Sequence, residues 1–267
     1  MGDSMIRDYI YFDGKSLEEY GLYITNAGIY NPAERDYEKV SVPGRNGDLL
    51  FENDRFNNVV LSYPAVIAQD FDINFNELKS YLLSKVGYLR LEDSFHPDEY
   101  YEATFNGFEN IKVTPDGKMG TFTLVFDRKP QKFLKSGETS IEISTAQSPS
   151  HYVNIMNPTR YTAKPLYVIR YTGLLTIYYN GSPYNQIRIK RPNSSEEGYI
   201  GTLYIDTDIM EAYAINGGVQ ESRNSWISVE QGDMFPAFSA NVNKVAFYAM
   251  GVQEAYFASV IPRWWTV

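Results

Sequence analysis

The chain has 267 residues, a formal net charge of −9 and no cysteine. The lack of cysteine excludes disulfides, thiolate metal sites, iron–sulfur clusters and cysteine nucleophiles. The acidic balance argues against a nucleic-acid binder held by phosphate contacts, and no apolar run approaches the ~20 residues that a membrane helix needs. Because 43% of the residues are apolar, the chain has the composition of a folded protein with a substantial core.

The negative charge is concentrated in the first half. Residues 1–134 hold 14 Lys and Arg against 22 Asp and Glu, a net charge of −8, whereas residues 135–267 hold 10 against 11, a net charge of −1. The stretch 135–150 is rich in Ser, Thr, Gly and Pro, which is typical of linkers. We therefore predict two domains, 1–134 and 151–267, joined by a linker at 135–150; a long loop inside one domain is the alternative.

The first half is predicted to consist of strands interrupted by one helix. Runs rich in Tyr, Phe and β-branched residues predict strands at residues 9–12, 21–24, 58–63, 87–91, 100–105 and 120–126. One segment instead has the apolar spacing of a helix, carried by Phe71, Phe75, Leu78 and Leu82. This spacing predicts a helix near residues 74–85, with Asn74 as its cap and Gly87 as its stop.

The second half shows strand patterns alone. Strands are predicted at residues 165–171, 174–179, 201–206 and 244–249. Asn180-Gly181 is a strong hairpin-turn dipeptide. Short strands with regular turn signals indicate a β-sandwich, so the predicted fold class is mainly β with one helix, in two domains.

Motifs for catalysis or metal binding are nearly absent. The chain has two histidines, His96 and His151, and it lacks a G-x-S-x-G elbow, an H-E-x-x-H motif and a Walker loop. His96 lies in a polar turn and is interpreted as a solvated loop histidine. We therefore predict no catalytic residue, no cofactor and no metal.

Two groups of acidic residues are candidate sites. Asp206-Thr207-Asp208 resembles the start of a calcium loop, but the glycine and the final glutamate at loop spacing are missing. An acidic hairpin turn is the preferred interpretation. Neighbouring carboxylates leave a glycosidase as a third functional class, and they occur at Glu18-Glu19, Asp98-Glu99 and Glu196-Glu197.

The most distinctive local string is Val42-Pro43-Gly44-Arg45-Asn46-Gly47-Asp48-Leu49. Proline fixes φ and the glycines allow positive φ, so the string predicts a turn between two strands with Arg45 at its apex. An arginine held there can make bidentate contacts. A generic hairpin loop is the alternative interpretation. The candidate oligomer-interface residues are Pro43, Gly44, Arg45, Asn46, Gly47 and Leu49.

This string belongs to an ordered set that spans nearly the whole chain. In the first half the set includes Tyr20-Gly21-Leu22-Tyr23-Ile24, Gly87-Tyr88-Leu89-Arg90-Leu91 and Phe122-Thr123-Leu124-Val125-Phe126-Asp127-Arg128-Lys129-Pro130. In the second half it includes Asn157-Pro158-Thr159, Ile177-Tyr178-Tyr179-Asn180-Gly181, Gly232-Asp233-Met234-Phe235-Pro236 and Ile261-Pro262-Arg263-Trp264-Trp265. In that order the strings resemble the distal tail protein (Dit) family of long-tailed siphophages and related prophages.

The resemblance implies a structural protein without enzymatic activity. It implies a first domain with a β-sandwich or split-barrel-like fold and one helix, which forms a homohexameric ring that an extended arm helps to close. This ring would join the tail tube protein to the tail-associated fibre or lysin protein, and DNA would pass through it without specific binding. The implied location is the virion tail tip, after assembly in the bacterial host cytoplasm, with no membrane association.

The resemblance also implies that the second domain is a galectin-like or carbohydrate-module-like β-sandwich. This domain would dock baseplate or receptor-binding proteins. The sugar-binding run of true galectins is not preserved, because His151 is followed by Asn157-Pro158-Thr159-Arg160 with altered spacing and an inserted threonine. A carbohydrate-binding adhesion module that recognises host cell-wall saccharides remains the alternative function.

Two expectations follow for a ring. Acidic residues of 1–134 are expected to line its channel, because an acidic wall repels DNA phosphates. A closed ring needs head-to-tail interfaces between unlike surfaces, and loop 43–50 with its flanking strands is the candidate contact, as an arm reaching a neighbour.

Overall fold

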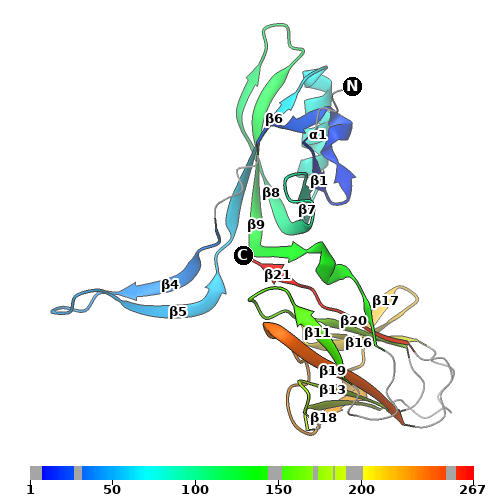
Figure 1. Cartoon of the computed structure of the whole chain (residues 1–267). Coiled ribbons are helices and arrows are strands. Elements are labelled where there is room, and N and C mark those ends of the chain that lie inside the picture. Colours follow the sequence, from blue (N-terminus) through cyan, green and yellow to red (C-terminus); the bar gives the residue numbers. More distant parts are fainter. Residues whose placement is uncertain are drawn as a thin grey trace, which may run out of the picture. The chain divides into compact units, whose positions relative to one another are not determined.

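A computed structural model describes residues 8–26, 32–143, 152–170, 174–182, 184–190, 201–250 and 257–267 (Figure 1). Strands dominate these ranges, and they contain a single α-helix. This confirms the predicted mainly β fold class with one helix. The chain divides into two compact units, one comprising Met1–Phe133 with Val267 and the other Leu134–Thr266.

The first unit contains nine strands, one 3₁₀ helix and the α-helix within its described residues. In chain order these are β1 (Ile10–Phe12), β2 (Lys15–Ser16), η1 (Leu17–Tyr20), β3 (Leu22–Ile24), β4 (Arg35–Val40), β5 (Leu49–Phe56), β6 (Val59–Ile67), α1 (Phe71–Leu83), β7 (Leu89–Asp93), β8 (Glu99–Val113) and β9 (Gly120–Leu134). Strands β8 and β9 each have 15 residues, about twice the length that their aromatic runs predicted.

Most of these strands form one curled sheet in the order β2-β1-β7-β8-β9-β6-β3. The short η1 joins β2 to β3 and so connects the two edges of the sheet. The backbone N–H of Ile24, in β3, donates a hydrogen bond of 3.0 Å to the carbonyl of Asp8, just before β1. Because its two edges approach each other, the sheet matches the split-barrel alternative of the prediction rather than a two-layer sandwich.

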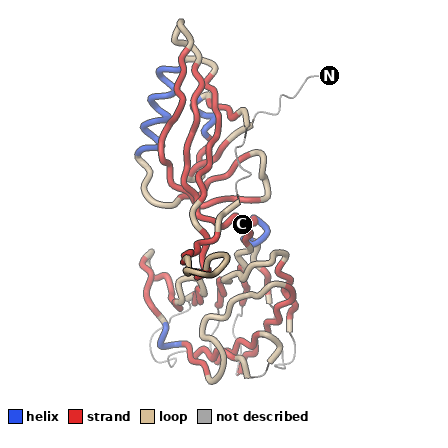
Figure 2. Tube along the Cα trace, turned by 90° about the vertical axis from the view of Figure 1, so that its left-hand side faces the viewer, coloured by secondary structure: helices blue, strands red, loops and turns tan. Residues whose placement is uncertain are grey.

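Helix α1 packs against the inner face of this sheet (Figure 2). Its buried residues are Phe71, Leu78 and Leu82, three of the four that defined the helical spacing. The helix begins at Phe71, so the predicted start near residue 74 is wrong. Asn74 is not the cap, because it is the fourth residue of the helix, and its side-chain amide donates a hydrogen bond of 2.9 Å to the carbonyl of Gln69.

Gly120 allows the close approach of α1 to β9. A Cβ atom at this position would lie 2.3 Å from the Phe71 ring, so any larger residue would push the helix away from the sheet. The ring of Phe71 also stacks on that of Phe75, with a centroid distance of 4.9 Å. Aromatic packing of this kind adds to the stabilisation that burial alone provides.

A buried polar cluster fills one end of the first core. Tyr63 donates to Asp93 at 2.9 Å, and Arg128, which is fully buried, donates to the carbonyls of Lys129 and Pro130 at 2.9 and 2.8 Å. Burial, and then the charge of Asp93, raises the pKa of Tyr63, so the phenol stays protonated and acts as a donor. These bonds satisfy the Tyr63 hydroxyl and one terminal nitrogen of Arg128, whereas the buried Nε atom of Arg128 has no hydrogen-bond partner within the described residues.

The second unit is built from strands and short 3₁₀ helices. They are η2 (Lys135–Glu138), β10 (Ile141–Glu142), β11 (Val153–Asn157), β12 (Leu166–Arg170), β13 (Leu174–Tyr179), β14 (Gln186–Lys190), β15 (Thr202–Asp206), β16 (Glu211–Asn216), β17 (Val219–Ser222), η3 (Asn224–Trp226), β18 (Ile227–Val229), β19 (Asn241–Met250), β20 (Phe257–Ile261) and β21 (Trp265–Thr266).

Two antiparallel sheets of this unit share one hydrophobic core. Their strand orders are β10-β20-β12-β15-β16-β17 and β11-β19-β13-β14-β18. Tyr167 of the first sheet faces Phe247 of the second with ring centroids 6.4 Å apart, and both side chains are fully buried. The arrangement is a β-sandwich, as the strand and turn spacing predicted.

The two ends of the second unit lie together. The N–H of Leu134 donates to the carbonyl of Trp264 at 2.9 Å, and the N–H of Arg263 donates to that of Gly137 at 2.8 Å. Strand β10 pairs with β20 a few residues farther on. Residues 135–143, predicted as part of a linker, are therefore folded in the second unit together with Leu134, which was predicted as the end of the first domain. Residues 144–151 lie outside the described residues.

Candidate functional site

The distinctive 42–49 string lies at the tip of a two-stranded arm. Among the described residues, strands β4 and β5 pair only with each other, in a sheet separate from the curled sheet, and they extend away from it (Figure 1). At the base, the N–H of Asn57 donates to the carbonyl of Glu34 at 2.8 Å. There Arg55 donates to Asp36 at 2.7 Å, and this hydrogen bond lowers the pKa of the Asp36 carboxyl.

The tip of the arm contains the turn that the sequence predicted. The N–H of Arg45 donates to the carbonyl of Val42 at 3.2 Å, and Gly44 between them has a φ of 81°. Proline followed by a glycine of positive φ is the pattern of a type II turn. Gly47 has the same φ of 81°, so both glycines of the string are at positions that a side chain would strain.

Neither strand of the arm contains a buried residue. Four large apolar side chains are exposed, with exposed fractions of 57% for Leu50, 53% for Phe51, 38% for Tyr37 and 37% for Val40. An isolated two-stranded hairpin is at best marginally stable in water. The exposed apolar side chains therefore mark the arm as an interaction surface.

The two faces of the arm differ in character. Side chains alternate along a strand, and the register pairs Val40 with Leu49 and Glu38 with Phe51. Near the tip, one face thus carries Val40, Leu49 and Phe51, with Glu38 opposite Phe51, and we call it the apolar face of the arm. The opposite face carries Lys39 beside Leu50, which is paired with it.

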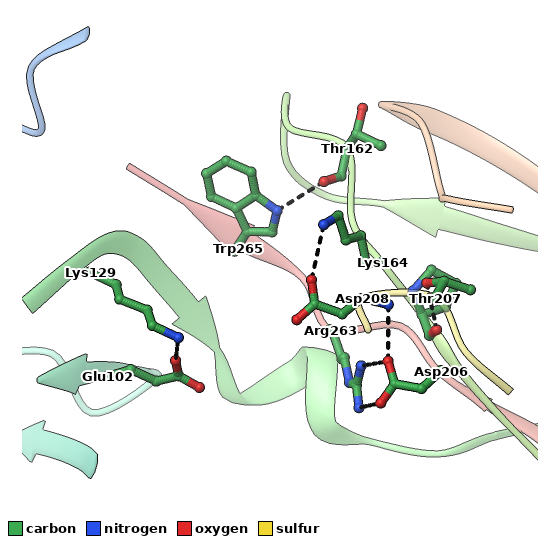
Figure 3. A network of polar contacts seen from close by, with 10 residues as sticks. Glu102, Lys129, Thr162, Lys164, Asp206, Thr207, Asp208, Arg263 and Trp265 are labelled. Atoms are coloured by element: carbon green, nitrogen blue, oxygen red, sulfur yellow. Dashed lines mark hydrogen bonds and ion pairs between the residues drawn. The ribbon is translucent and has the colours of Figure 1, made fainter. Parts of the chain in front are cut away.

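The acidic turn of the second unit is neutralised internally (Figure 3). Asp206 receives two hydrogen bonds from Arg263, at 2.7 and 2.8 Å, and Lys164 pairs with Asp208 at 3.0 Å. Burial alone would raise the pKa of Asp206, but the hydrogen bond and charge of Arg263 outweigh it and lower that pKa below its ordinary value. Both carboxylates serve the fold, as the hairpin-turn interpretation predicted.

The run that replaces the galectin motif also serves the fold. Asn157 is buried, and its amide nitrogen donates to the carbonyls of Tyr161 and Ser239 at 2.9 and 3.2 Å. Its side-chain oxygen accepts bonds from the N–H and hydroxyl of Thr159, both at 2.9 Å. These bonds occupy both ends of the amide, and His151 lies outside the described residues.

The histidine of the first unit is held by its own turn. The Nδ1 atom of His96 lies 3.2 Å from Asp93, which also accepts bonds from the N–H groups of Phe95 and His96 at 2.9 Å. His96 is therefore a hydrogen-bonded turn residue rather than a freely solvated one. Within the described ranges, no group of three or more His, Cys, Asp or Glu side chains is arranged to hold a metal ion.

Solved structures of phage tail proteins match nearly the whole chain. The Dit protein of phage SPP1, described as a paradigm of the hub adsorption apparatus in phages that infect Gram-positive bacteria, matches with a TM-score of 0.68 and 12% identity over 97% of this chain and 99% of its own. This is the distal tail protein fold. The family resemblance seen in the sequence is thereby confirmed at the level of the fold.

Two structures of the phage P2 baseplate in its activated conformation also have this fold. The one with Ca has a TM-score of 0.53 and 11% identity over 96% of this chain and 98% of the matched chain, and the one with Sr has a TM-score of 0.52 and 11% identity over 95% and 97%. No protein-family model and no curated protein matches the sequence. The likeness to these proteins therefore rests on the fold, at 11–12% identity.

The tip of the arm is predicted from the sequence, but its exposed apolar side chains are not. Pro43, Gly44, Arg45, Asn46 and Gly47 lie together in the tip loop, and Leu49 begins β5. Leu50 and Phe51 expose more apolar surface than Leu49, which is half-buried. The run of three apolar residues after a Gly-rich turn was the available signal, but a buried strand gives the same pattern.

Proposed function

We propose that this chain is a structural component of a siphophage tail, which assembles as a homohexameric ring at the tail tip. In this proposal the ring joins the tail tube protein to the tail-associated fibre or lysin protein. The second unit faces outward and docks a baseplate or receptor-binding protein. Assembly takes place in the host cytoplasm, and the chain needs no cofactor and performs no catalysis.

The observation that carries the proposal is the arm, on a distal tail protein fold. A ring requires unlike surfaces on each copy, one of which reaches into the next. Both strands of the arm have backbone edges that no other strand of the described ranges pairs with, and apolar side chains are exposed near its tip. Pairing with a second copy would cover surface that an isolated chain leaves in water.

The charge of the first unit supports a channel for DNA. Its acidic excess includes exposed carboxylates on α1, at Asp72 and Glu77, and on the turn between β8 and β9, at Asp116. We expect acidic side chains of this unit to face the channel. Proteins hold DNA phosphates through cationic side chains, so a wall of acidic side chains lets DNA pass without binding. An electron-microscopy structure of the ring with these carboxylates on the outer rim would contradict this expectation.

None of the helices in the described part of the chain has the length and apolar character that crossing a membrane requires. The alternative function, adhesion to cell-wall saccharides, predicts binding in a titration of the full chain with such saccharides, whereas a structural hub binds none. The bonds that occupy Asn157 make the galectin-like run a poor sugar site.

The experiment that tests the ring is the mass of the assembled chain. Native mass spectrometry of the full chain is expected to show six copies. Arg45→Glu is expected to lower the mass measured by light scattering, because it reverses the charge at the tip of the arm. Arg160→Glu, an equal charge change at an exposed site of the second unit, is the control and should leave the ring intact.

If Arg45→Glu forms the same hexamer as the wild type, loop 43–50 is not an essential interface. If the wild-type chain forms no ring at any concentration or salt, the proposed function itself fails.

A further inference from the structure

An arm that reaches a neighbour needs a surface to receive it. In a head-to-tail ring every copy supplies both surfaces, so the receiving surface also lies on this chain. The distal arm is nearly uncharged, because residues 40–49 contain only Arg45 and Asp48 as charged residues, and Glu38 and Lys39 are the next charges along it. Placing apolar side chains over unpaired charges costs desolvation, so the receiving surface should be uncharged as well.

The outer face of the curled sheet has one half that does not meet this condition. On β7, Arg90 and Glu92 form an ion pair of 2.5 Å. On β8, Glu102 pairs with Lys129 of β9, also at 2.5 Å (Figure 3). These charges are matched with each other, and covering them would remove water from both members of each pair.

The other half of the outer face meets the condition. The four outward pairs of the β6–β9 ladder contain one charged residue, Asp127, which stands opposite Val60. The other seven outward positions are uncharged. These positions, which we call the β6–β9 surface, are Val60, Ser62, Pro64, Val66, Thr121, Thr123 and Val125. Val60 is 53% exposed and Thr121 is exposed, whereas Ser62, Pro64, Val66 and Thr123 are half-buried and Val125 is buried.

A single carboxylate marks one end of this surface. Asp127 stands opposite Val60 in the register of β6 and β9, and it accepts one hydrogen bond of 2.8 Å from Asn58. Arg45 is exposed at the tip of the arm, and no ion pair engages it within the described part of the chain. The part of β6 from Val60 to Val66 is about 20 Å long, at ~3.3 Å per residue. The β6–β9 surface is therefore long enough to receive the distal arm.

We propose that the apolar face of the arm packs on the β6–β9 surface of the next copy, with Arg45 at the Asp127 end. This inference rests on the proposed ring and names the surface that each arm contacts there. Apolar side chains then meet an uncharged surface, and the cation of the tip meets a carboxylate that can accept a bidentate contact.

The absence of cysteine makes the proposal directly testable. One chain carries Val40→Cys on the apolar face of the arm. A second chain, with a different tag, carries Ser62→Cys, Val66→Cys or Thr123→Cys on the β6–β9 surface. The two chains are mixed, assembled and oxidised, and a cross-link between the two tags is read on a non-reducing gel.

Separate chains exclude a cross-link within one copy. We expect a disulfide-linked pair for at least one of the three receiving positions. Lys39→Cys, the neighbouring residue on the opposite face of the arm, is the matched control and should give no linked pair. Native mass spectrometry of the same mixtures before oxidation reports whether rings are present.

The outcomes separate the inference from the proposed function. Rings that give no linked pair, or that link equally well through Lys39→Cys, overturn the inference and leave the ring standing. Mixtures without rings and without linked pairs overturn both. Linked pairs between two copies of the Val40→Cys chain would show that arms meet arms, which also overturns the inference.

A charge exchange gives a second readout. Arg45→Glu is expected to weaken the ring, and Asp127→Lys in the same chain is expected to restore it by reversing the pair. Glu102→Lys is the matched control on the ion-paired half and should not restore it. Restoration by Glu102→Lys instead of Asp127→Lys would place the arm on that half and overturn the inference.

Discussion

The arm of the first unit and the β13–β14 hairpin of the second unit are built alike but packed differently. Both are antiparallel pairs that follow or contain a turn with positive φ, at Gly44 in the arm and at Asn180 and Gly181 in the second unit. Yet β13 buries Leu175, Ile177 and Tyr179, whereas the arm buries none of its side chains.

This difference shows that turn chemistry and strand pairing define a hairpin without deciding where its apolar surface goes. The second unit covers the apolar face of β13 with its own sandwich core. In the arm, comparable side chains stay in water within the described part of the chain. Substitutions in the two regions should therefore affect different properties, stability in the sandwich and assembly in the arm.

The largest effect on stability is expected in the core of the sandwich. Phe247→Ala removes a fully buried ring and should lower the free energy of unfolding by about 3–5 kcal/mol. All three tryptophans, at positions 226, 264 and 265, lie in the second unit, so their fluorescence during denaturant unfolding reports this unit alone. A loss below about 1 kcal/mol would contradict the assigned core.

Breaking the ion pair between Asp206 and Arg263 is expected to cause the second-largest loss of stability. Asp206→Ala leaves Arg263 without its carboxylate and is expected to cost about 3 kcal/mol, at the lower end for a broken buried pair because Arg263 is 31% exposed. Asp208→Ala breaks the exposed pair with Lys164 and should cost no more than about 1 kcal/mol. Equal losses for the two variants would contradict the role given to Asp206.

The same pair predicts a pH dependence. Because the folded state lowers the pKa of Asp206 below its ordinary value of 3.8, its contribution to stability is present above that pH and is lost as the pH falls through the lowered pKa. Unfolding followed by tryptophan fluorescence should therefore show a decline below pH 3.8. Asp206→Asn should reduce this decline, and an unchanged profile would argue against the assignment.

The smallest effect on stability is expected in the arm. Phe51→Ser replaces an exposed ring that contacts no core and should change the unfolding free energy of the isolated chain by less than about 0.5 kcal/mol. Thermal unfolding at a concentration where the chain is monomeric measures this. A loss comparable to that of Phe247→Ala would mean that the arm packs on its own chain.

Local patterns predicted most elements but not their extent. The spacing of Phe71, Leu78 and Leu82 predicted a helix, because these side chains share one buried face. Its start was misplaced, since Asp70 at the N-cap makes no side-chain cap bond and leaves no capping signal. The length of β8 and β9 was also missed, because the outer part of β8 is polar and exposed.

Local sequence patterns could not predict the role of residues whose partners lie far away in the sequence. The pairing of Asp206 with Arg263 joins positions 57 residues apart in the sequence. The part of the linker that folds as β10 was missed for the same reason, since its partner β20 lies near the end of the chain. By contrast, the tip of the arm was predicted correctly, because Pro43 and Gly44 determine their own turn.

The central claim is that the exposed apolar face of the arm joins copies of this chain. The most direct test is native mass spectrometry of the variant Phe51→Ser beside the wild type, at equal concentration and salt. The account predicts a six-copy ring for the wild type and single chains for the variant, with the same unfolding midpoint for both monomers. A six-copy ring for both would contradict it.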